Sequence, residues 1–252
     1  MTRHLRRAVL LTFGLLFASV AHAQDTVPAT APAVVDSEAP AWKVAIRPYF
    51  FLAGVSGSVT SGSNTIPINS TFGDILDNVK LSLFTSIALE KGRWGVYGDF
   101  QYIDLNAEGS GAVGGTVGLR NIIGEVDGTY RPHGTEGLRL VAGVRGYQVD
   151  QTVTIGANPP VKAKTLVIDP IIGAVGVWRL GESWQFRLRG DIGGFGVSSE
   201  FTSQLSLVVL YDISKVVSIP LGYRTLNYRI KTDGIHMDTG MGGLVVGVDI
   251  RP

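Results

Sequence analysis

Charged side chains recur at every second position in several segments of this 252-residue chain. Arg187, Arg189 and Asp191 follow one another at a spacing of two, and Glu125 and Asp127 repeat that spacing. Because alternate residues of a β-strand point to the same side, each set is expected to share one face of a strand. Such faces could line a selective channel, or they could pair with one another in a salt-bridged core.

Residues suited to catalysis are sparse. An enzyme would need a nucleophile, a base and an orienting carboxylate within reach of one another. Beyond the N-terminal segment the histidines are His133 and His236, and neither has a serine and a carboxylate at a recognisable spacing. His236, close to Asp233 and Asp238, is the one candidate, and no calcium-loop spacing is present. We therefore expect no enzyme, no catalytic residues, no metal site and no cofactor.

The segment Arg93–Asn106 indicates which kind of element positions the charged residues. Its alternate residues form an apolar face, which begins at Trp94 and ends at Tyr102, and a polar face that carries Asp99. The distance from Trp94 to Tyr102 is about 26 Å along a strand. A tilt of about 40° reduces this to roughly 20 Å of height, close to the apolar band of an outer-membrane barrel. The segment is therefore expected to cross a membrane as one strand of a barrel.

Ten segments of this alternating kind follow one another after residue 42. They are Lys43–Val59, Val79–Glu90, Arg93–Asn106, Thr116–Arg131, Leu138–Gln151, Thr165–Leu180, Trp184–Ser198, Gln204–Asp212, Val217–Ile230 and Thr239–Ile250. The expected fold is all-β, a transmembrane antiparallel up-and-down β-barrel with about ten strands. Eight or twelve strands are alternatives, because segment boundaries read from sequence carry an error of about 2–4 residues.

The connections between the segments alternate in length. Those after the second, fourth, sixth and eighth segments are compact, and most of the others are longer. Short periplasmic turns and long outer loops are typical of outer-membrane barrels, and an even strand count places both ends of the barrel in the periplasm. Aromatic residues beside the compact turns are expected to form a girdle at the periplasmic rim. They are Trp94, Tyr130, Trp178, Trp184 and Tyr211.

Inside such a barrel the charged faces of the strands would meet. The expected lumen charge network comprises Arg47, Asp99, Glu125, Asp127, Arg145, Asp169, Arg187, Arg189, Asp191 and Arg224. About eight strands leave room only for side chains or one small ligand, and open channels need about sixteen. With about ten strands and balanced charges, we expect salt-bridged side chains to plug the lumen.

The N-terminus predicts export. Arg3, Arg6 and Arg7 lead into an apolar run that ends at Val20, and the small-x-small sequence Ala21-His22-Ala23 follows. This pattern is typical of a secretory signal, and the run is shorter than the roughly 20 residues of a membrane-spanning helix. The expected parts of the chain are a cleaved signal peptide at residues 1–23, a disordered periplasmic leader at 24–41 and the barrel at 42–252.

Composition agrees with an exported barrel. The chain has 0 cysteines, 33 glycines and only 17% charged residues. Beyond the N-terminal run, no apolar stretch is long enough for a transmembrane helix, so the chain is apolar by alternation, as a barrel requires. The net charge of +1 gives no argument for nucleic-acid binding.

Three local features carry specific expectations. Pro48 cannot donate to a strand ladder, so it is expected at a bulge or at an unpaired position. The alternation slips after Arg224, and Leu226 fits better if a bulge intervenes. In the long loop that precedes the second segment, Asp74 is expected to cap a short helical turn.

A soluble lipocalin-like barrel or a sandwich is the main alternative fold. In such a protein the apolar face of each strand points inward and the charged face points outward, so alternation alone fits both arrangements. The export signal, the aromatic rim and the asymmetry of the turns favour the membrane barrel.

Several short motifs resemble those of small Gram-negative outer-membrane β-barrel proteins of a largely uncharacterised kind. They are Trp42-x5-Pro48-Tyr49 with Gly54 and Gly57, Arg93-Trp94-Gly95 with Asp99 and Tyr102, and Leu221-Gly222-Tyr223-Arg224. The resemblance covers most of Trp42–Ile250, and it implies a barrel fold and an outer-membrane location.

The sequence therefore predicts an integral outer-membrane β-barrel with a structural or surface-interaction role and a plugged lumen. A narrow channel for small solutes and an outer-rim lipid-modifying enzyme are the alternatives. The expected partners are outer-membrane lipid and the barrel-insertion machinery, and the protein is expected to be a monomer that binds no nucleic acid.

Overall fold

The structure is a computed structural model that describes residues 41–252 apart from four short segments. Those segments are residues 62–63, 110–114, 156–160 and 233–234. The expected signal peptide, and the expected leader up to residue 40, lie outside the described residues. In the described part of the chain, no helix has both the length and the apolar character needed to cross a membrane.

Strands account for most of the described chain. They are β1 (Lys43–Ser61), β2 (Asn64–Ser70), β3 (Val79–Lys91), β4 (Trp94–Gly109), β5 (Gly115–Tyr130), β6 (Leu138–Ile155), β7 (Val161–Leu180), β8 (Trp184–Gly193), β9 (Phe201–Asp212), β10 (Val217–Thr232), β11 (Ile235–Gly247) and β12 (Asp249–Ile250). One helix, α1 (Phe72–Asn78), lies between β2 and β3. Neither β2 nor the length of this helix was evident from the sequence, because this region reads as a long polar loop.

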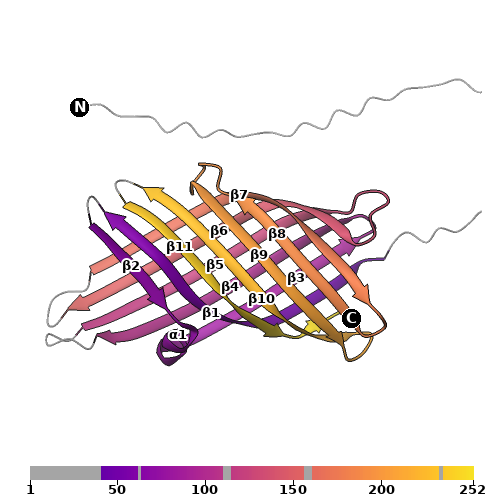
Figure 1. Ribbon diagram of the computed structural model, residues 1–252, viewed down its shortest axis with the longest axis horizontal. Coiled ribbons are helices and arrows are strands. Elements are labelled where there is room, and N and C mark those ends of the chain that lie inside the picture. The colour runs from indigo at the N-terminus through magenta and orange to yellow at the C-terminus, as the bar shows by residue number, and fades with distance from the viewer. Residues whose placement is uncertain (1–40, 62–63, 110–114, 156–160, 233–234) are drawn as a thin grey trace, which may run out of the picture. The chain divides into compact units, whose positions relative to one another are not determined.

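The antiparallel sheet closes on itself. Strands adjacent in sequence pair from β3 to β11, and β1 completes the ring by pairing with β11 on one side and β3 on the other. The short β12 continues the line of β11, and β2 folds back onto the outer part of β1. Counting β11 and β12 as one, the wall has ten strands within the described residues, and Figure 1 shows them running obliquely around the barrel. The expected antiparallel up-and-down barrel is confirmed.

The wall has an apolar outer face and a polar inner face. On β8, Leu188 and Ile192 are exposed, whereas Gln185, Arg189 and Asp191 are buried inside the barrel. This arrangement is the reverse of a soluble barrel, where apolar side chains fill the interior. It suits a hydrocarbon surrounding, because the ring also pairs most of the backbone of each strand with its neighbours. The soluble alternative is therefore excluded.

Strand β8 ends at Gly193, earlier than the Ser198 predicted from the sequence. The reason is the backbone of the next three residues, Gly194, Phe195 and Gly196, whose φ angles are 88°, 48° and 75°. This left-handed region is incompatible with a strand, and for Phe195 it is a strained conformation. The chain therefore turns here, and the wall is low on the side of β8 and β9.

The bulge predicted after Arg224 is wrong. The registers of β10 with β9 and with β11 run without a shift through Leu226, Asn227 and Tyr228. Alternation therefore continues, and Leu226 and Tyr228 point into the barrel, where both are almost fully buried. The inward residues of β10 change from polar to apolar after Arg224. In the sequence this change looks the same as a shift of the alternation by one residue.

The predictions for Pro48 and for the cap of the short helix have different outcomes. Pro48 falls between the ladders that β1 forms with β12 at Ile46 and with β11 from Tyr49 onward, so on the side that its backbone faces it is at an unpaired position, as predicted. The cap of α1 is Thr71 and not Asp74: the Thr71 hydroxyl accepts from the Asp74 amide at 3.3 Å. The Asp74 carboxylate in turn accepts hydrogen bonds from the Thr71 hydroxyl at 2.7 Å and from the Thr71 amide at 2.8 Å. These hydrogen bonds lower the pKa of the Asp74 carboxyl group.

Glycines on the inner face make room for buried carboxylates, which yields a prediction. A Cβ at Gly143 would lie 2.3 Å from Asp127 Oδ1, and a Cβ at Gly173 would lie 2.5 Å from Asp191 Cβ. Gly143→Ala is therefore expected to destabilise the barrel by about 1–3 kcal/mol through overpacking. Gly124→Ala on the outer face meets nothing within 4 Å and is the matched control. Equal urea unfolding midpoints for both variants would contradict the prediction.

Candidate functional site

The centre of the lumen is an interlocked group of two arginines and three carboxylates. Arg145 lies 2.6 Å from Glu125 and 2.7 Å from Asp191. Arg189 lies 2.6 Å from Glu125, and 2.9 Å from both Asp127 and Asp191. All five side chains are at most 9% exposed, so the group spans the interior from β5 and β6 to β8. The two guanidinium groups compensate most of the charge of the three carboxylates and connect the strands that carry them.

A second group of charges lies nearer the compact turns. Arg47 and Arg187 both donate to the same Oδ2 atom of Asp249, at 2.7 and 3.2 Å. Asp249 is fully buried, whereas the two guanidinium groups are partly exposed. Two cations thus share one carboxylate, and this end of the lumen carries a local excess of positive charge. Asp249 is a member that the sequence prediction left out of the candidate network.

The third group joins opposite walls. Arg224 on β10 donates to Gln204 Oε1 at 2.9 Å and lies 3.5 Å from Asp99 on β4. The Tyr49 hydroxyl donates to Asp99 at 3.0 Å and accepts from Arg224 at 3.0 Å. Tyr97 also belongs to the network, because its ring lies 5.0 Å from the Arg189 guanidinium. The inward positions of Tyr49, Tyr97 and Gln204 were readable from alternation, but their partners were not.

Asp169 does not join the network in the way that the sequence predicted. It is buried on the inner side of β7, yet among the described residues no ion pair includes it. Its Oδ1 atom accepts from the amides of Ser198 and Ser199, at 3.1 and 2.8 Å. Asp169 thus fastens the turn between β8 and β9 to the wall. The prediction failed because sequence spacing cannot show which loop folds down onto a strand.

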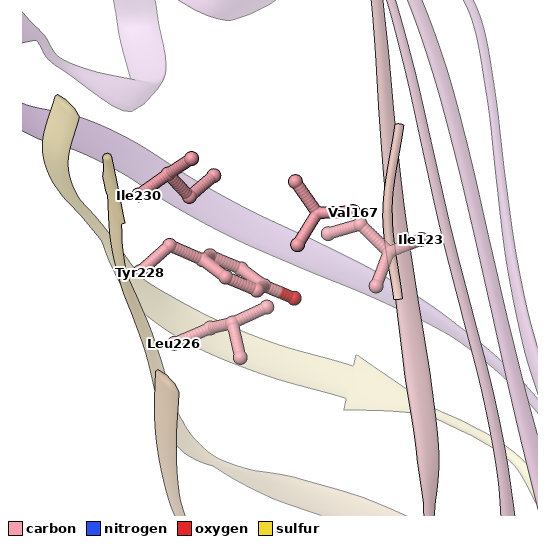
Figure 2. Packing of buried hydrophobic residues seen from close by; sticks show 5 residues of the cluster. All are labelled: Ile123, Val167, Leu226, Tyr228 and Ile230. Carbon is pink, nitrogen blue, oxygen red and sulfur yellow. The ribbon is translucent and has the colours of Figure 1, made fainter. Parts of the chain in front are cut away.

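Above the charged groups the lumen is apolar. Ile123 and Val167 come from one side of the barrel, and Leu226, Tyr228 and Ile230 come from β10 on the other side. Figure 2 shows the two sets facing each other across the interior, with the Tyr228 ring between them. Tyr147 packs on Tyr228 in a tilted arrangement, with ring centroids 4.8 Å apart. The lumen is therefore filled by an apolar layer as well as by a charged layer.

A cavity remains below the charged centre, toward the compact turns. Its volume is about 180 Å³. Its charged lining includes Arg47, Arg139, Arg187, Arg224 and Asp99, and its apolar lining comes from valines and Pro220. Cations therefore predominate on the surface that faces this cavity.

The predicted girdle residues lie together at the end with the compact turns. Trp94 packs on Tyr130 with ring centroids 4.6 Å apart, and Trp184 packs on Tyr211 at 4.8 Å. Trp178 packs on Phe186 at 5.7 Å. The three tryptophans and Tyr211 are exposed on the outer face, and Tyr130 is half-buried beneath Trp94. Amphipathic rings at this height suit a membrane interface.

The histidines are at opposite ends of the barrel, as the sequence predicted. His133 lies in a compact turn and contacts the Arg93 side chain. His236, near the opposite end, lies 3.9 Å from Glu200. The neighbouring Asp238 pairs instead with Arg229 at 3.1 Å, and Asp233 lies outside the described residues. A base with an orienting carboxylate is therefore not assembled from His236 and Asp238.

Comparisons with known proteins agree with the geometry. No protein family and no curated protein matches the chain. Among solved structures, the outer membrane protease OmpT from Escherichia coli is similar, with a TM-score of 0.57 and 8% identity over 85% of this chain and 99% of OmpT. The translocator domain of the autotransporter NalP from Neisseria meningitidis has a TM-score of 0.49 and 13% identity, over 86% and 91% of the two chains.

The fold and the lipid-compatible exterior together define the class of protein. It is an integral β-barrel protein of the Gram-negative outer membrane, with charged residues buried in its interior. At 8% identity, the likeness to OmpT extends to the fold alone.

Proposed function

We propose that this protein is a closed outer-membrane barrel with a surface-interaction role, and that it is not a solute channel. The observation that carries the proposal is the filled lumen. Arg145 in the charged layer is 1% exposed, and Leu226 in the apolar layer is 0% exposed. A solute would have to break both layers to pass, and the charged layer would be costly to separate. The proposed role is therefore an interaction at the outside of the barrel.

The uneven height of the wall supports a role at the outer surface. β7 has 20 residues and β8 has 10. At a tilt of about 40° these lengths correspond to roughly 50 and 25 Å of height, and the apolar band is only about 25 Å tall. One side of the wall therefore rises well above the membrane. Its raised part carries solvated charges, including Arg120 with Asp104 and Lys164 with Asp150.

Conductance in planar bilayers tests the closed lumen. The purified protein is expected to give no discrete current steps, because both filled layers must open before ions can cross. Heat-modifiable migration on gels, measured on the same preparation, establishes that the inserted protein is a folded barrel. Discrete steps from a preparation that passes this check would overturn the proposal.

A narrow channel is the second candidate, and the arginine-lined cavity favours it. This cavity of about 180 Å³ lies below the charged centre of the lumen, and cations predominate on its surface. In that case the current steps would be anion-selective, because Arg47 and Arg187 would face the passing ion. The same bilayer measurement therefore separates the two candidates.

The proposal includes no catalytic step. Asp238 is engaged by Arg229, and among the described residues His236 pairs with Glu200 at 3.9 Å, with both side chains 43% exposed. Catalysis at an exposed pair of this kind lacks the exclusion of water that strengthens electrostatic effects at an active site. An unchanged pattern of lipid A acylation after deletion of the gene would agree with this part of the proposal, and a changed pattern would contradict it.

A further inference from the structure

The periplasmic end of the lumen holds two arginines that share one carboxylate. Arg47 on β1 donates through Nε to Asp249 Oδ2 at 2.7 Å, and Arg187 on β8 donates through Nη2 to the same atom at 3.2 Å. No other hydrogen bond of either guanidinium group occurs among the described residues, although each group carries several N–H donors. Two cations that meet one anion also leave one positive charge uncompensated. This pair of arginines is therefore suited to bind a second anion.

Both arginines line the cavity of about 180 Å³ below the charged centre. Arg139 on β6 lines it as well, and its buried Nη1 atom has no hydrogen-bond partner among the described residues. The carboxylates of the lining are Glu90 and Asp99, and each of them already pairs with an arginine. The cavity surface thus has more N–H donors than acceptors, and its charge favours an anion.

Apolar side chains lie directly beside the arginines of the cavity. Val177 on β7 and Val208 on β9 are the cross-strand neighbours of Arg187, one on each side. Val175 on β7 is the cross-strand neighbour of Arg139. All three valines belong to the lining of the cavity. An anion with an apolar body would contact both kinds of side chain, whereas a fully hydrated inorganic ion would leave the valines without a partner.

The cavity is reached from the periplasmic end. There the side chains of Arg47 and Arg187 are 18% and 23% exposed, and that of Glu90 is 32% exposed. Toward the lumen centre the cavity ends at Arg189, which is 9% exposed and belongs to the charged centre. An engineered protein cavity of about 150 Å³ binds benzene, so a cavity of about 180 Å³ fits a molecule of roughly that size with one small substituent.

We propose that this cavity is a binding site for a small organic carboxylate that enters from the periplasm. The ligand carboxylate accepts hydrogen bonds from Arg47 and Arg187 and balances their excess charge, since its planar oxygens match the donor fork of a guanidinium group. The apolar body of the ligand lies against the valines beside Arg187. This site goes beyond the proposed function, because a lumen that is closed to ions can still hold a ligand at one end.

Calorimetric titration of the full-length barrel in a nonionic detergent tests the site, with benzoate as the probe at neutral pH. We expect saturable binding of one benzoate per barrel. Benzamide has the same ring without the charge, and inorganic phosphate has charge without an apolar body, so each should bind at least about tenfold more weakly. Equal affinity for benzoate and benzamide, equal affinity for benzoate and phosphate, or no saturable binding of benzoate would each overturn the proposal.

Arg187→Gln removes the excess cation and leaves Arg47 paired with Asp249, so the variant is expected to fold. Its affinity for benzoate should fall at least about tenfold, because charge-assisted hydrogen bonds to the ligand are lost. Arg229→Gln changes an exposed pair near the other end of β10 and is the matched control, which should bind benzoate as the unaltered protein does. Heat-modifiable migration verifies the fold of each variant. Equal benzoate affinities of the two folded variants would refute the site.

Val177→Phe tests the cavity without changing any charge. The added ring would occupy the space beside Arg187, so the affinity for benzoate should again fall at least about tenfold. Unchanged affinity in this variant would place the benzoate elsewhere and would contradict the proposal, whether or not Arg187→Gln folds. Bilayer conductance is measured separately and decides only on the closed lumen, so failure of the proposed function and failure of this site are distinguishable.

Discussion

Replacing Arg189 with alanine is expected to lower the free energy of unfolding by about 3–5 kcal/mol. The Arg189 guanidinium lies within 2.9 Å of Glu125, Asp127 and Asp191, and it is only 9% exposed. Without it, Arg145 would remain in contact with Glu125 and Asp191, but Asp127 would lose the cation beside it. A buried charge left without its partner is costly, because water cannot reach it. Urea unfolding in lipid vesicles measures the change.

Arg229→Ala is the matched control for this prediction. The Arg229 pair with Asp238 has a comparable separation of 3.1 Å, but both side chains are about half exposed. Exposed pairs contribute about 0–1 kcal/mol, so the control should unfold almost as the unaltered protein does. If Arg189→Ala left the unfolding midpoint unchanged and altered ion selectivity instead, the lumen would be a wet channel and the closed-barrel proposal would fail.

Alternation predicted the wall of the barrel well because it reports on both faces at once. Strands such as Trp184–Gly193 carry an unbroken two-residue period, and the membrane requires one face of each strand to be apolar. The compact turns predicted the chain direction, since each one joins strands that pair in register. These signals are local, which is why one sequence sufficed to read them.

The filling of the lumen was predicted only in part. The inward positions of Arg145, Arg189 and Asp191 follow from period two, but the choice of partners depends on the closure of the ring. Leu226 shows the limit most clearly: an inward leucine contradicted the assumption of a polar lumen, and a bulge was wrongly inferred. The apolar layer forms because Leu226 meets Ile123 from a distant strand, which no local pattern encodes.

The end of the β1–β3 ladder and the turn after β8 were also not predictable from the sequence. Pro48 marked a position without an amide donor, but nothing in the sequence showed that the ladder between β1 and β3 would end there. Asp169 read as one more lumen charge, because nothing near it in sequence announces that Ser198 and Ser199 donate to it. Both features arise where a loop packs on the wall, and loop placement depends on contacts between distant residues.

The second large effect concerns the outer face of the wall. Leu188→Arg is expected to destabilise the barrel by about 2–4 kcal/mol in lipid vesicles, because the residue lies near the middle of the membrane. It is four residues above Trp184 of the girdle, which is roughly 10 Å of the approximately 25 Å band. A charge at this depth cannot reach water on either side, and the neighbouring outer-face side chains, Leu207 among them, offer no partner.

Leu180→Arg is the control for this prediction. Leu180 lies on the same outer face but at a different depth, so the comparison separates the effect of depth from a general intolerance of arginine. Leu180 ends β7 beside a compact turn, opposite Trp184, and it is 58% exposed. At the interface an arginine reaches water, so Leu180→Arg should cost only about 0–1 kcal/mol. If the two variants unfolded at the same urea concentration, the outer face would not follow the depth profile of a bilayer. The orientation of the wall toward lipid, on which the closed-barrel proposal depends, would then be wrong.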